Sequence, residues 1–254
     1  RSLIERQTNP TAASEAVADI QFGNYHALVI GANAYKHLPK LKTAINDAKS
    51  IAAKLETLYG FKVRLLLDPT RDDIIDAFDD YWETLEFQDN LLIYYTGHGW
   101  LDESTDRGYW LPVDAKKGRR AEWLSNADIT DTLKSLAAKH VMVVADSCYS
   151  GTLTRSASVG LRDANYLKRI ARKRARVAMV SGGLEPVEDN GGGGNSPFAR
   201  AFLNALSDNP DIIDGTRLFA AIRRPVILDA KQTPEYSDVR DSGHDGGDFL
   251  FVRK

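Results

Sequence analysis

Two short motifs in the sequence combine residue types that support nucleophilic catalysis. The stretch from Tyr94 to Gly99 reads Tyr-Tyr-Thr-Gly-His-Gly, and the stretch from Asp146 to Gly151 reads Asp-Ser-Cys-Tyr-Ser-Gly. A thiol attacks a carbonyl carbon as a thiolate, so it needs a neighbour that takes its proton and later protonates the leaving amine. Imidazole performs both tasks near neutral pH. We therefore predict that Cys148 is a nucleophile and that His98 is its acid/base partner.

Glycine residues lie close to both of these side chains. Gly97 and Gly99 flank His98, and Gly151 follows Cys148. Because glycine lacks a Cβ atom, the backbone there can approach a substrate, and its N–H groups can point at a developing oxyanion. The backbone amides of Gly99 and Cys148 are the predicted oxyanion hole.

A structural interpretation competes with each catalytic one. Cys148 is the only cysteine, which excludes an internal disulfide and a multi-cysteine zinc site, and a lone cysteine after an apolar strand is usually a packed thiol. An isolated histidine is likewise usually a loop residue. Four histidines lie in no motif and are assigned no role: His26, His37, His140 and His244. The presence of both motifs, in order on two predicted strands, favours the catalytic interpretation.

The elements that position the motifs follow from hydrophobic periodicity. A short apolar run closed by Gly31 predicts a buried strand over residues 26–30, and further strands are predicted over 62–67, 90–95, 141–145 and 176–181. Helical spacing predicts helices over residues 43–58, 71–85, 129–138 and 198–206, and a last strand or edge segment covers 248–252. Strands that alternate with helices imply an α/β fold with a mainly parallel sheet covered on both faces. Ligands bind at the carboxyl ends of such strands, where both motifs lie.

Composition favours one soluble globular domain. With 254 residues, 43% of them hydrophobic, the chain is long enough for one large core, and no apolar stretch is long enough to span a membrane. Residues 1–22 are polar and predict an N-terminal linker or peripheral segment before a domain over 23–254. The formal net charge of -2 and the lack of a phosphate-binding loop argue against nucleic-acid, membrane and nucleotide partners. A cytoplasmic location is favoured.

The motifs resemble those of the caspases (clan CD, peptidase family C14) and, more closely, of the metacaspases and bacterial caspase homologues. Residues 95–99 match the pattern aromatic, Ser or Thr, Gly, His, Gly. Residues 146–151 match Asp-Ser-Cys followed by an aromatic residue or His and then Ser-Gly. The histidine precedes the cysteine by about 50 residues, as in caspases. Three further segments look like the family: Leu111–Asp114, Ser181–Gly182 and Ser196–Phe198.

This resemblance implies a caspase-like three-layer α/β/α sandwich with a mainly parallel sheet of about six strands. It implies a large-subunit-like part to about residue 154, a basic linker over about 155–176 and a small-subunit-like part over about 177–254. The implied activity is that of a cysteine endopeptidase, which hydrolyses peptide bonds with a Cys–His dyad through a thioester acyl-enzyme.

The resemblance also implies a specificity pocket. In metacaspases, the positions that match Asp47 and Asp146 form an acidic pocket for the basic residue before the scissile bond, and Thr96 and Ala44 match the same pocket wall. Cleavage after Arg or Lys follows, unlike the Asp preference of caspases. Two carboxylates hold one guanidinium by charge-assisted hydrogen bonds and repel an acidic side chain. In the structural interpretation, Asp146 caps a turn and Asp47 is a solvated helix residue.

The segment from Thr152 to Arg176 is rich in Ser, Gly and basic residues and is expected to be exposed. An enzyme with an acidic pocket would find self-cleavage sites there. The alternative is a polar loop or basic helix that is never cut. The self-cleavage candidates are Arg155, Arg162, Lys168, Arg169, Arg172, Lys173, Arg174 and Arg176.

Many metacaspases need calcium held by a cluster of acidic side chains, and this chain departs from that pattern. Asp128-Ile-Thr-Asp131 has a Thr in place of one acidic residue, and Arg155 stands where another carboxylate would follow the cysteine motif. Calcium prefers six to eight oxygen ligands, so these changes weaken a site. We expect activity without a metal or other cofactor, and calcium is the disfavoured alternative.

Two other functions stay open at this point. One is a catalytically silent caspase-like interaction module, against which the intact His98 and Cys148 argue. The other is a regulator of the same fold that a partner or flanking domain activates. For a peptidase, the expected partners are protein or peptide substrates with basic residues.

Overall fold

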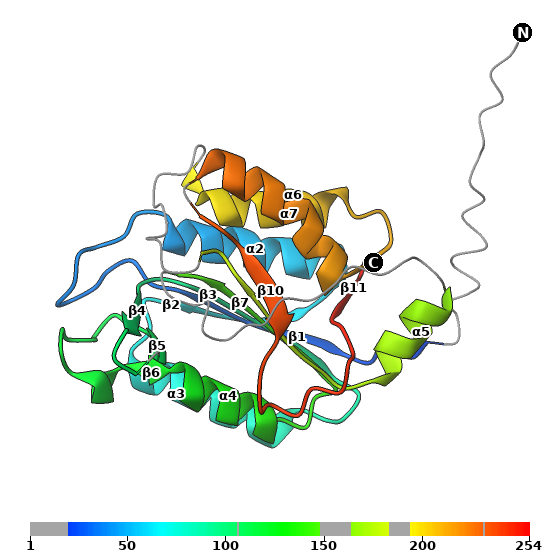
Figure 1. The fold of residues 1–254 in the computed structure, drawn as a ribbon, viewed down its shortest axis with the longest axis horizontal. Helices are drawn as coiled ribbons and strands as arrows, with labels where there is room; N and C mark the ends of the chain where they lie inside the picture. Colours follow the sequence, from blue (N-terminus) through cyan, green and yellow to red (C-terminus); the bar gives the residue numbers. More distant parts are fainter. Residues whose placement is uncertain (1–19, 106, 148–163, 183–193, 231) are drawn as a thin grey trace, which may run out of the picture.

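A six-stranded sheet forms the centre of the molecule (Figure 1). The computed structural model describes residues 20–105, 107–147, 164–182, 194–230 and 232–254. The strand order is β10-β8-β7-β3-β1-β2; β10 is antiparallel to its neighbour and the other strands are parallel. The strands are β1 (Tyr25–Gly31), β2 (Lys62–Leu67), β3 (Asn90–Thr96), β7 (His140–Asp146), β8 (Ala175–Val180) and β10 (Glu235–Asp238). The predicted α/β class with a mainly parallel sheet is confirmed.

The strands in the middle of this sheet are buried along their whole length. Every residue of β3, β7 and β8 is buried. Continuous apolar runs are what a parallel sheet with helices on both faces requires. The five strands predicted from such runs lie within one residue of their expected bounds.

Helices α2, α6 and α7 lie on one face of the sheet, and α3 and α4 lie on the other (Figure 1). Their bounds are α2 (Ala44–Tyr59), α3 (Arg71–Thr84), α4 (Asn126–Ser135), α6 (Pro197–Asp208) and α7 (Gly215–Asp229). Each face has its own apolar core, with Ile51 and Phe202 in the first and Ile74 and Ile129 in the second. The predicted three-layer sandwich is therefore confirmed.

The predicted helix over residues 129–138 is displaced toward the amino terminus. α4 begins at Asn126 because Ser125 caps its first turn in a capping box with Asp128. Leu136 is already extended, so the helix ends at Ser135. The prediction extended the helix to residue 138 because the apolar spacing continues beyond Ser135.

Smaller elements surround the central sheet. The polar insertion after β3 forms a three-stranded antiparallel sheet, β4-β5-β6, and β9 pairs with β11 outside the central sheet. Their bounds are β4 (Gly99–Asp102), β5 (Arg107–Trp110), β6 (Leu124–Ser125), β9 (Ile212–Asp214) and β11 (Leu250–Val252), with the 3-10 helix η1 (Arg120–Glu122) before β6. Within the described residues, every helix is too short or too polar to cross a lipid bilayer.

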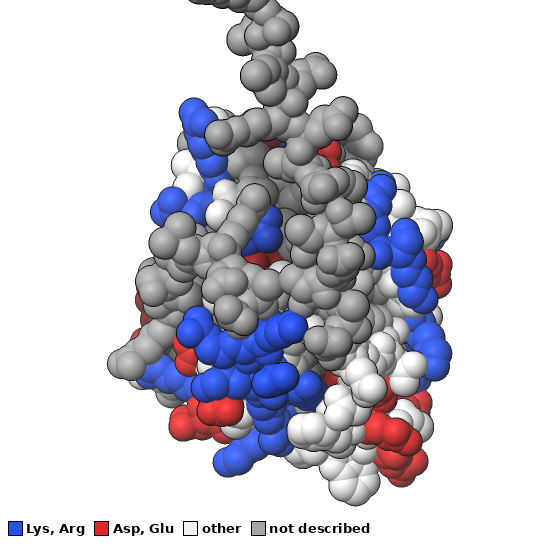
Figure 2. Space-filling view, turned by 90° about the vertical axis from the view of Figure 1, so that its right-hand side faces the viewer, with Lys and Arg blue, Asp and Glu red and all other residues white. Residues whose placement is uncertain are grey.

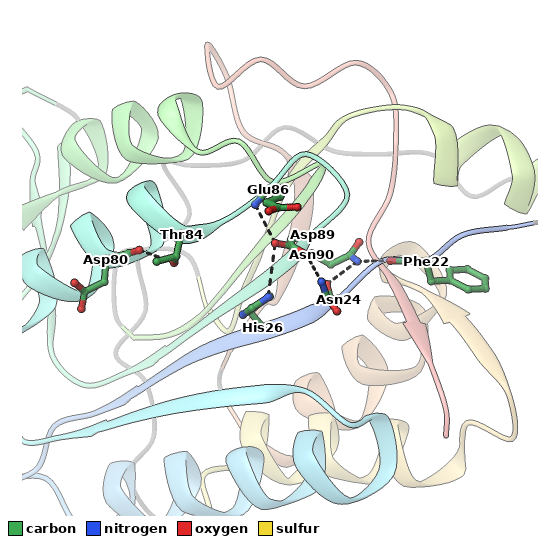
Figure 3. A network of polar contacts seen from close by, with 8 residues as sticks. All are labelled: Phe22, Asn24, His26, Asp80, Thr84, Glu86, Asp89 and Asn90. Carbon is green, nitrogen blue, oxygen red and sulfur yellow. Dashed lines mark hydrogen bonds and ion pairs between the residues drawn. The ribbon is translucent and has the colours of Figure 1, made fainter.

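A polar network ties together the amino ends of the central strands (Figure 3). The carboxylate of Asp89, just before β3, accepts hydrogen bonds from Asn24 Nδ2 and from the backbone N–H of Glu86, both at 2.9 Å. Nε2 of His26 in β1 lies 3.8 Å from the same carboxylate. Asn90 donates to two carbonyl oxygens of the segment that enters β1, at 2.5 and 3.1 Å. His26 thus belongs to a structural network at the end of the sheet opposite the two motifs.

The basic segment before β8 is folded where the structure describes it. Helix α5 (Ala164–Arg172) contains Lys168, Arg169 and Arg172; Lys173 and Arg174 connect it to β8, and Arg176 lies within β8. Arg155 and Arg162 lie outside the described residues. Figure 2 shows the side of the molecule that carries α5, with Lys and Arg side chains gathered over its lower half.

The expectation that Arg176 is exposed is wrong. It is 0% exposed, and its guanidinium donates at 2.7–3.2 Å to the carbonyl oxygens of Leu133, Leu136, Ala138, Lys139 and Ala175. The last carbonyl groups of a helix have no partner within the helix, and Arg176 supplies donors at the carboxyl end of α4. The peptide bond after Arg176 therefore lies in the core. The prediction of Arg176 as a self-cleavage site is wrong, because a peptidase cannot reach this bond in the folded protein.

Candidate active site

The two motifs lie side by side at the carboxyl ends of β3 and β7. Thr96 pairs with Asp146 in the parallel register of these strands. The backbone N–H of Gly97 lies 3.4 Å from the carbonyl oxygen of Asp146. His98 follows directly after Gly97, whereas Cys148 lies outside the described residues. The structure thus brings the strand ends that carry both halves of the predicted site to one edge of the sheet.

Several contacts hold His98 in place. Its backbone N–H donates to Tyr35 Oη at 2.7 Å, and its ring packs against the Tyr35 ring with centroids 4.5 Å apart. Nε2 of His98 lies 2.8 Å from the carbonyl oxygen of Pro39. Because a carbonyl oxygen can only accept a hydrogen bond, this contact assigns the ring hydrogen to Nε2 and makes Nδ1 the basic nitrogen. An imidazole held in this way can take a proton through Nδ1.

Two tyrosines approach the backbone just before His98. A Cβ atom on Gly97 would lie 2.7 Å from Tyr35 Oη and 2.8 Å from Tyr95 Oη, so only glycine leaves room for both hydroxyls. Tyr95 Oη donates to the carbonyl oxygen of His98 at 2.7 Å, and the Tyr95 ring stacks on Trp110 of β5 with centroids 4.4 Å apart. The small sheet is thereby fixed against the end of β3.

The strand register supports Gly99 as an N–H donor. Gly99 lies opposite Trp110 in the β4–β5 pair, and the N–H of Leu111 donates to the carbonyl oxygen of His98 at 3.0 Å. In an antiparallel ladder, hydrogen-bonded and non-hydrogen-bonded pairs alternate, so the N–H of Gly99 points away from β5. This direction suits an oxyanion donor. Its predicted partner, the N–H of Cys148, lies outside the described residues.

Two buried carboxylates lie near the same edge of the sheet. Asp47, in the first turn of α2, is 0% exposed, and Asp146, the last residue of β7, is 2% exposed. Burial raises the pKa of Asp47 to about 7, and repulsion from Asp146 adds to the rise. Both carboxylates also act with burial to raise the pKa of Tyr94. Asp47 is therefore not the solvated helix residue of the structural interpretation.

Donors from the start of α6 reach both carboxylates. Asp47 Oδ1 accepts from Asn195 Nδ2 at 2.8 Å and from the backbone N–H of Ser196 at 3.0 Å. Asp146 Oδ2 accepts from Ser196 Oγ at 2.5 Å. The two hydrogen bonds to Asp47 Oδ1 oppose the rise in the pKa of Asp47. The acidic pair is thus held from a segment that lies far away in the sequence.

Ala44 and Thr96 lie at the same end of the sheet as the carboxylates. Thr96 is buried and pairs with Gly31 on one side and with Asp146 on the other. Ala44 begins α2, and a Cβ atom on Gly31 would lie 2.7 Å from the Ala44 carbonyl oxygen. All four predicted pocket residues are therefore at one edge of the sheet, and their contact with a substrate stays a prediction.

Four of the residues that shape this site were not among the predicted site residues, although Ser196 lies in the segment Ser196–Phe198 that looks like the family. Tyr35 and Pro39 lie in the loop after β1 and match no motif, so only their contacts with His98 reveal them. Asn195 and Ser196 had a weak signal, because a Ser followed by Pro is typical of a helix start. That signal predicts a helix cap and says nothing of the contact with Asp47.

The part of the chain that the structure describes contains no group of three or more His, Cys, Asp or Glu side chains that could hold a metal ion. Asp128 is engaged in the capping box at the start of α4, where its carboxylate accepts from Ser125 Oγ at 2.7 Å. The calcium question therefore stays a prediction.

Comparison with known proteins shows the family. The model of the caspase domain family (peptidase C14) matches residues 24–241. Metacaspase-1A of Neurospora crassa is 31% identical over 151 residues, which cover 52% of this chain and 33% of that protein. Human mucosa-associated lymphoid tissue lymphoma translocation protein 1 is 36% identical over 96 residues, which cover 38% of this chain and 11% of that protein. The chain thus spans a third or less of the length of these relatives.

Two solved structures have a similar fold. Protein GSU0716 from Geobacter sulfurreducens matches with a TM-score of 0.61 and 23% identity, over 89% of this chain and 99% of that one. Caspase-1 from Spodoptera frugiperda matches with a TM-score of 0.60 and 15% identity, over 87% of this chain and 89% of that one. At these identities the likeness shows the fold alone.

The fold and the two strand-end motifs define a caspase-like α/β domain. Since the family model covers most of the chain, this protein belongs to the caspase domain family, peptidase C14. That membership supports a cysteine peptidase-like function.

Proposed function

We propose that this domain is a cysteine endopeptidase that cleaves after Arg or Lys. The observation that carries the specificity is the buried pair of carboxylates, Asp47 and Asp146, at the strand edge that continues into Cys148. A cationic side chain that reached this pair would relieve their mutual repulsion and form charge-assisted hydrogen bonds. An acidic side chain would add a third negative charge and be repelled.

Catalysis is proposed to begin with the transfer of the Cys148 proton to Nδ1 of His98. The carbonyl oxygen of Pro39 accepts a hydrogen bond from Nε2 of the same ring and so holds the imidazole in position. The thiolate attacks the carbonyl carbon, and the negative charge on oxygen is stabilised by the N–H groups of Gly99 and Cys148. When the C–N bond breaks, His98 returns the proton to the leaving amine and a thioester remains. Water, deprotonated by His98, then hydrolyses the thioester and regenerates the thiol.

The proposed reaction needs no metal or other cofactor, and calcium is not expected to be required. The proposed partners are proteins or peptides with basic residues, not nucleic acids or membranes. A silent or partner-activated regulatory module is the competing proposal, and it differs in having no turnover when the domain is alone.

Fluorogenic peptides that differ only in the residue before the leaving group, Arg, Lys or Asp, test this proposal. We expect turnover of the Arg and Lys peptides, little turnover of the Asp peptide, and equal rates with calcium or with a chelator. Cys148→Ala and His98→Ala should each lower kcat by more than about 10³-fold, and their effects should not add.

His37→Ala is the matched control, because His37 is exposed and lies in no motif. It should retain the wild-type rate. Equal cleavage of Asp and Arg peptides would disprove the assigned specificity, and turnover by Cys148→Ala would disprove the nucleophile. A wild type without any turnover would favour the regulatory alternative, and strong activation by calcium would contradict the cofactor proposal.

A further inference from the structure

Ser196 connects the two carboxylates of the proposed pocket. Its backbone N–H donates to Asp47 Oδ1 at 3.0 Å, and its hydroxyl donates to Asp146 Oδ2 at 2.5 Å. Asn195 Nδ2 adds a hydrogen bond to Asp47 Oδ1 at 2.8 Å. Ser196 and both aspartates are buried. A single residue thus donates to two carboxylates that come from different elements, α2 and β7.

The amino end of α6 fixes the direction of this hydroxyl. Ser196 is the N-cap of α6, and its Oγ accepts the backbone N–H of Ala199 at 2.9 Å. A serine hydroxyl has one hydrogen, so an Oγ that accepts from the helix has that hydrogen available for Asp146. Pro197, the first residue of the helix, fixes the backbone where the chain enters it. The cap therefore turns Ser196 into an oriented donor.

The charges around the pair explain why such a donor matters. The charged group that acts on Asp47 is Asp146 of β7, and Tyr94 of β3 is the titratable group that faces both. Burial and this repulsion favour the protonated form of Asp47, while the hydrogen bonds from Asn195 and Ser196 favour the ionised form. The positive amino end of α6 acts in the same direction as these donors.

We infer that Ser196, helped by Asn195, is a positioning residue for substrate specificity: it holds Asp47 and Asp146 next to each other and donates to their carboxylates, which favours the ionised forms that receive a cationic side chain. The inference rests on the proposed function and identifies what keeps its pocket acidic. Ser196 itself touches no reacting atom in this role. Its effect reaches the substrate through the two carboxylates.

The pH profile for an Arg peptide tests the inference. Ser196→Ala removes the donor to Asp146, so protonation of the pair becomes easier and the acidic limb of kcat/KM should move to higher pH by about one unit. At pH values below both limbs this corresponds to a loss of about tenfold, mainly in KM. Ser196→Thr keeps a hydroxyl and should restore the wild-type limb.

Thr70→Ala is the matched control for the loss of a helix cap. Thr70 caps α3 in a capping box and makes no contact with the acidic pair. This variant should lose stability as Ser196→Ala does, without any movement of the acidic limb. If Ser196→Ala does not fold, Asn195→Ala replaces it, because Asn195 caps no helix and should shift the limb in the same direction. An unmoved limb in the folded Ser196→Ala or Asn195→Ala enzyme would overturn the inference.

A direct titration separates this inference from the proposed function. The carboxyl carbons of Asp47 and Asp146 are followed by NMR against pH in Cys148→Ala and in Cys148→Ala with Ser196→Ala. We expect the apparent pKa values of the pair to rise by about one unit when the hydroxyl is removed. If the wild type does not cleave Arg peptides, the proposed specificity is disproved, but the effect of Ser196 on the carboxyl pKa values can still be confirmed. Unchanged carboxyl pKa values would refute the role of Ser196 whatever the activity.

Discussion

At the scale of single residues, the buried carboxylates of Asp47 and Asp146 repel each other. Burial raises the pKa of Asp47 to about 7, and Asp146 contributes further repulsion. A buried ionised carboxylate costs stability unless donors compensate for the lost water. Functional sites often retain such a cost because the charge is needed for binding. The acidic pair is therefore expected to trade stability for specificity.

Asp47→Asn is predicted to stabilise the fold at neutral and higher pH. Since the folded pKa of Asp47, about 7, exceeds its ordinary value of 3.8, the folded state binds more protons than the unfolded state between these values. Stability from this group is thus full at low pH and is lost as pH rises through the window. The Asn variant lacks this loss, so its free energy of unfolding should exceed that of the wild type by about 1 to 3 kcal/mol near pH 8, and hardly at all near pH 4.

Urea unfolding of both proteins at several pH values measures this difference. Asp76→Asn is the control, since Asp76 is exposed on α3, outside the acidic pair, and its replacement should change stability by less than about 0.5 kcal/mol. The same Asp47→Asn variant should weaken cleavage after Arg by roughly 1 to 3 kcal/mol in kcat/KM. If Asp47→Asn is less stable than the wild type at pH 8, the ionised carboxylate of Asp47 does not destabilise the fold and the prediction is wrong.

The central site residues that the sequence predicts, His98, Cys148 and the two aspartates, are those whose chemistry restricts the residue type. The His98 and Asp146 motifs lie at strand ends, as predicted, because parallel strands present their carboxyl ends at one edge. Tyr35, Pro39 and Ser196 act through a hydroxyl, a carbonyl group and an N-cap, which many residues can supply. Such contacts depend on how distant segments fold together, so local sequence does not reveal them.

At the scale of elements, strands and helices set by local sequence were predicted, and those set by contacts between distant segments were missed. The buried strands β3, β7 and β8 are mostly apolar runs and were predicted almost to the residue. The short strands β4, β5 and β6 contain few such residues and are stabilised by pairing with one another and by contacts such as Tyr95 with Trp110. α7 contains Pro225, and a proline inside a segment argues against a helix when only the sequence is read. The helix nevertheless forms, and Asp214 caps its start by accepting the N–H of Arg217 at 2.9 Å.

Arg176 shows how a tertiary contact decides whether a basic residue at the start of β8 is exposed. The basic run that precedes β8 predicts exposure, but the strand register turns Arg176 inward against α4. Its guanidinium then supplies donors to carbonyl oxygens of α4 and of the segment after it. Burial lowers the pKa of Arg176, with Arg174 acting in the same direction, so these oxygens are what stabilise its charge. A tertiary contact has overridden a compositional signal.

Arg176→Met is predicted to destabilise the protein strongly. The methionine side chain fills much of the same space but leaves several buried carbonyl oxygens without a donor, so the free energy of unfolding should fall by more than about 3 kcal/mol. Arg172→Met is the control, because Arg172 is exposed on α5 and its replacement should change stability by less than about 0.5 kcal/mol. Equilibrium unfolding in urea measures both. A loss below about 1 kcal/mol for Arg176→Met would show that water replaces the guanidinium.

At the scale of the whole molecule, the parts of the chain on either side of the basic segment share one core. β7 precedes the segment and β8 follows it, and the two pair in parallel from His140 with Ala175 to Ala145 with Val180. On one face of the sheet, Tyr59 Oη of α2 donates to the carbonyl oxygen of Leu206 in α6 at 2.7 Å. Buried side chains of α2, α6 and α7 belong to one apolar cluster. A cut between the two parts would leave these contacts intact.

Self-cleavage is therefore predicted to occur after Arg155 or Arg162 and to leave the two fragments associated. A peptidase binds its substrate as an extended chain, whereas Lys168, Arg169 and Arg172 lie in α5 and Arg176 is buried in β8. The carbonyl oxygens of Lys173 and Arg174 are hydrogen-bonded within the fold, to His140 Nε2 at 3.1 Å and to the N–H of Asp245 at 3.0 Å, so these two peptide bonds are also poor substrates. Purified wild type, incubated at high concentration, should give two fragments on a denaturing gel that still elute together in native size-exclusion chromatography. Cys148→Ala should stay intact under the same conditions, and mass spectrometry of the new amino termini identifies the cut.

The double variant Arg155→Gln with Arg162→Gln distinguishes activation from incidental cutting. If processing activates the enzyme, this variant should remain a single chain with lower kcat/KM than the processed wild type. Full activity of the intact variant would remove processing as an activation step. New termini inside α5 or β8, or fragments that separate on the native column, would contradict the argument from the shared sheet, since six residue pairs join β7 to β8 in register.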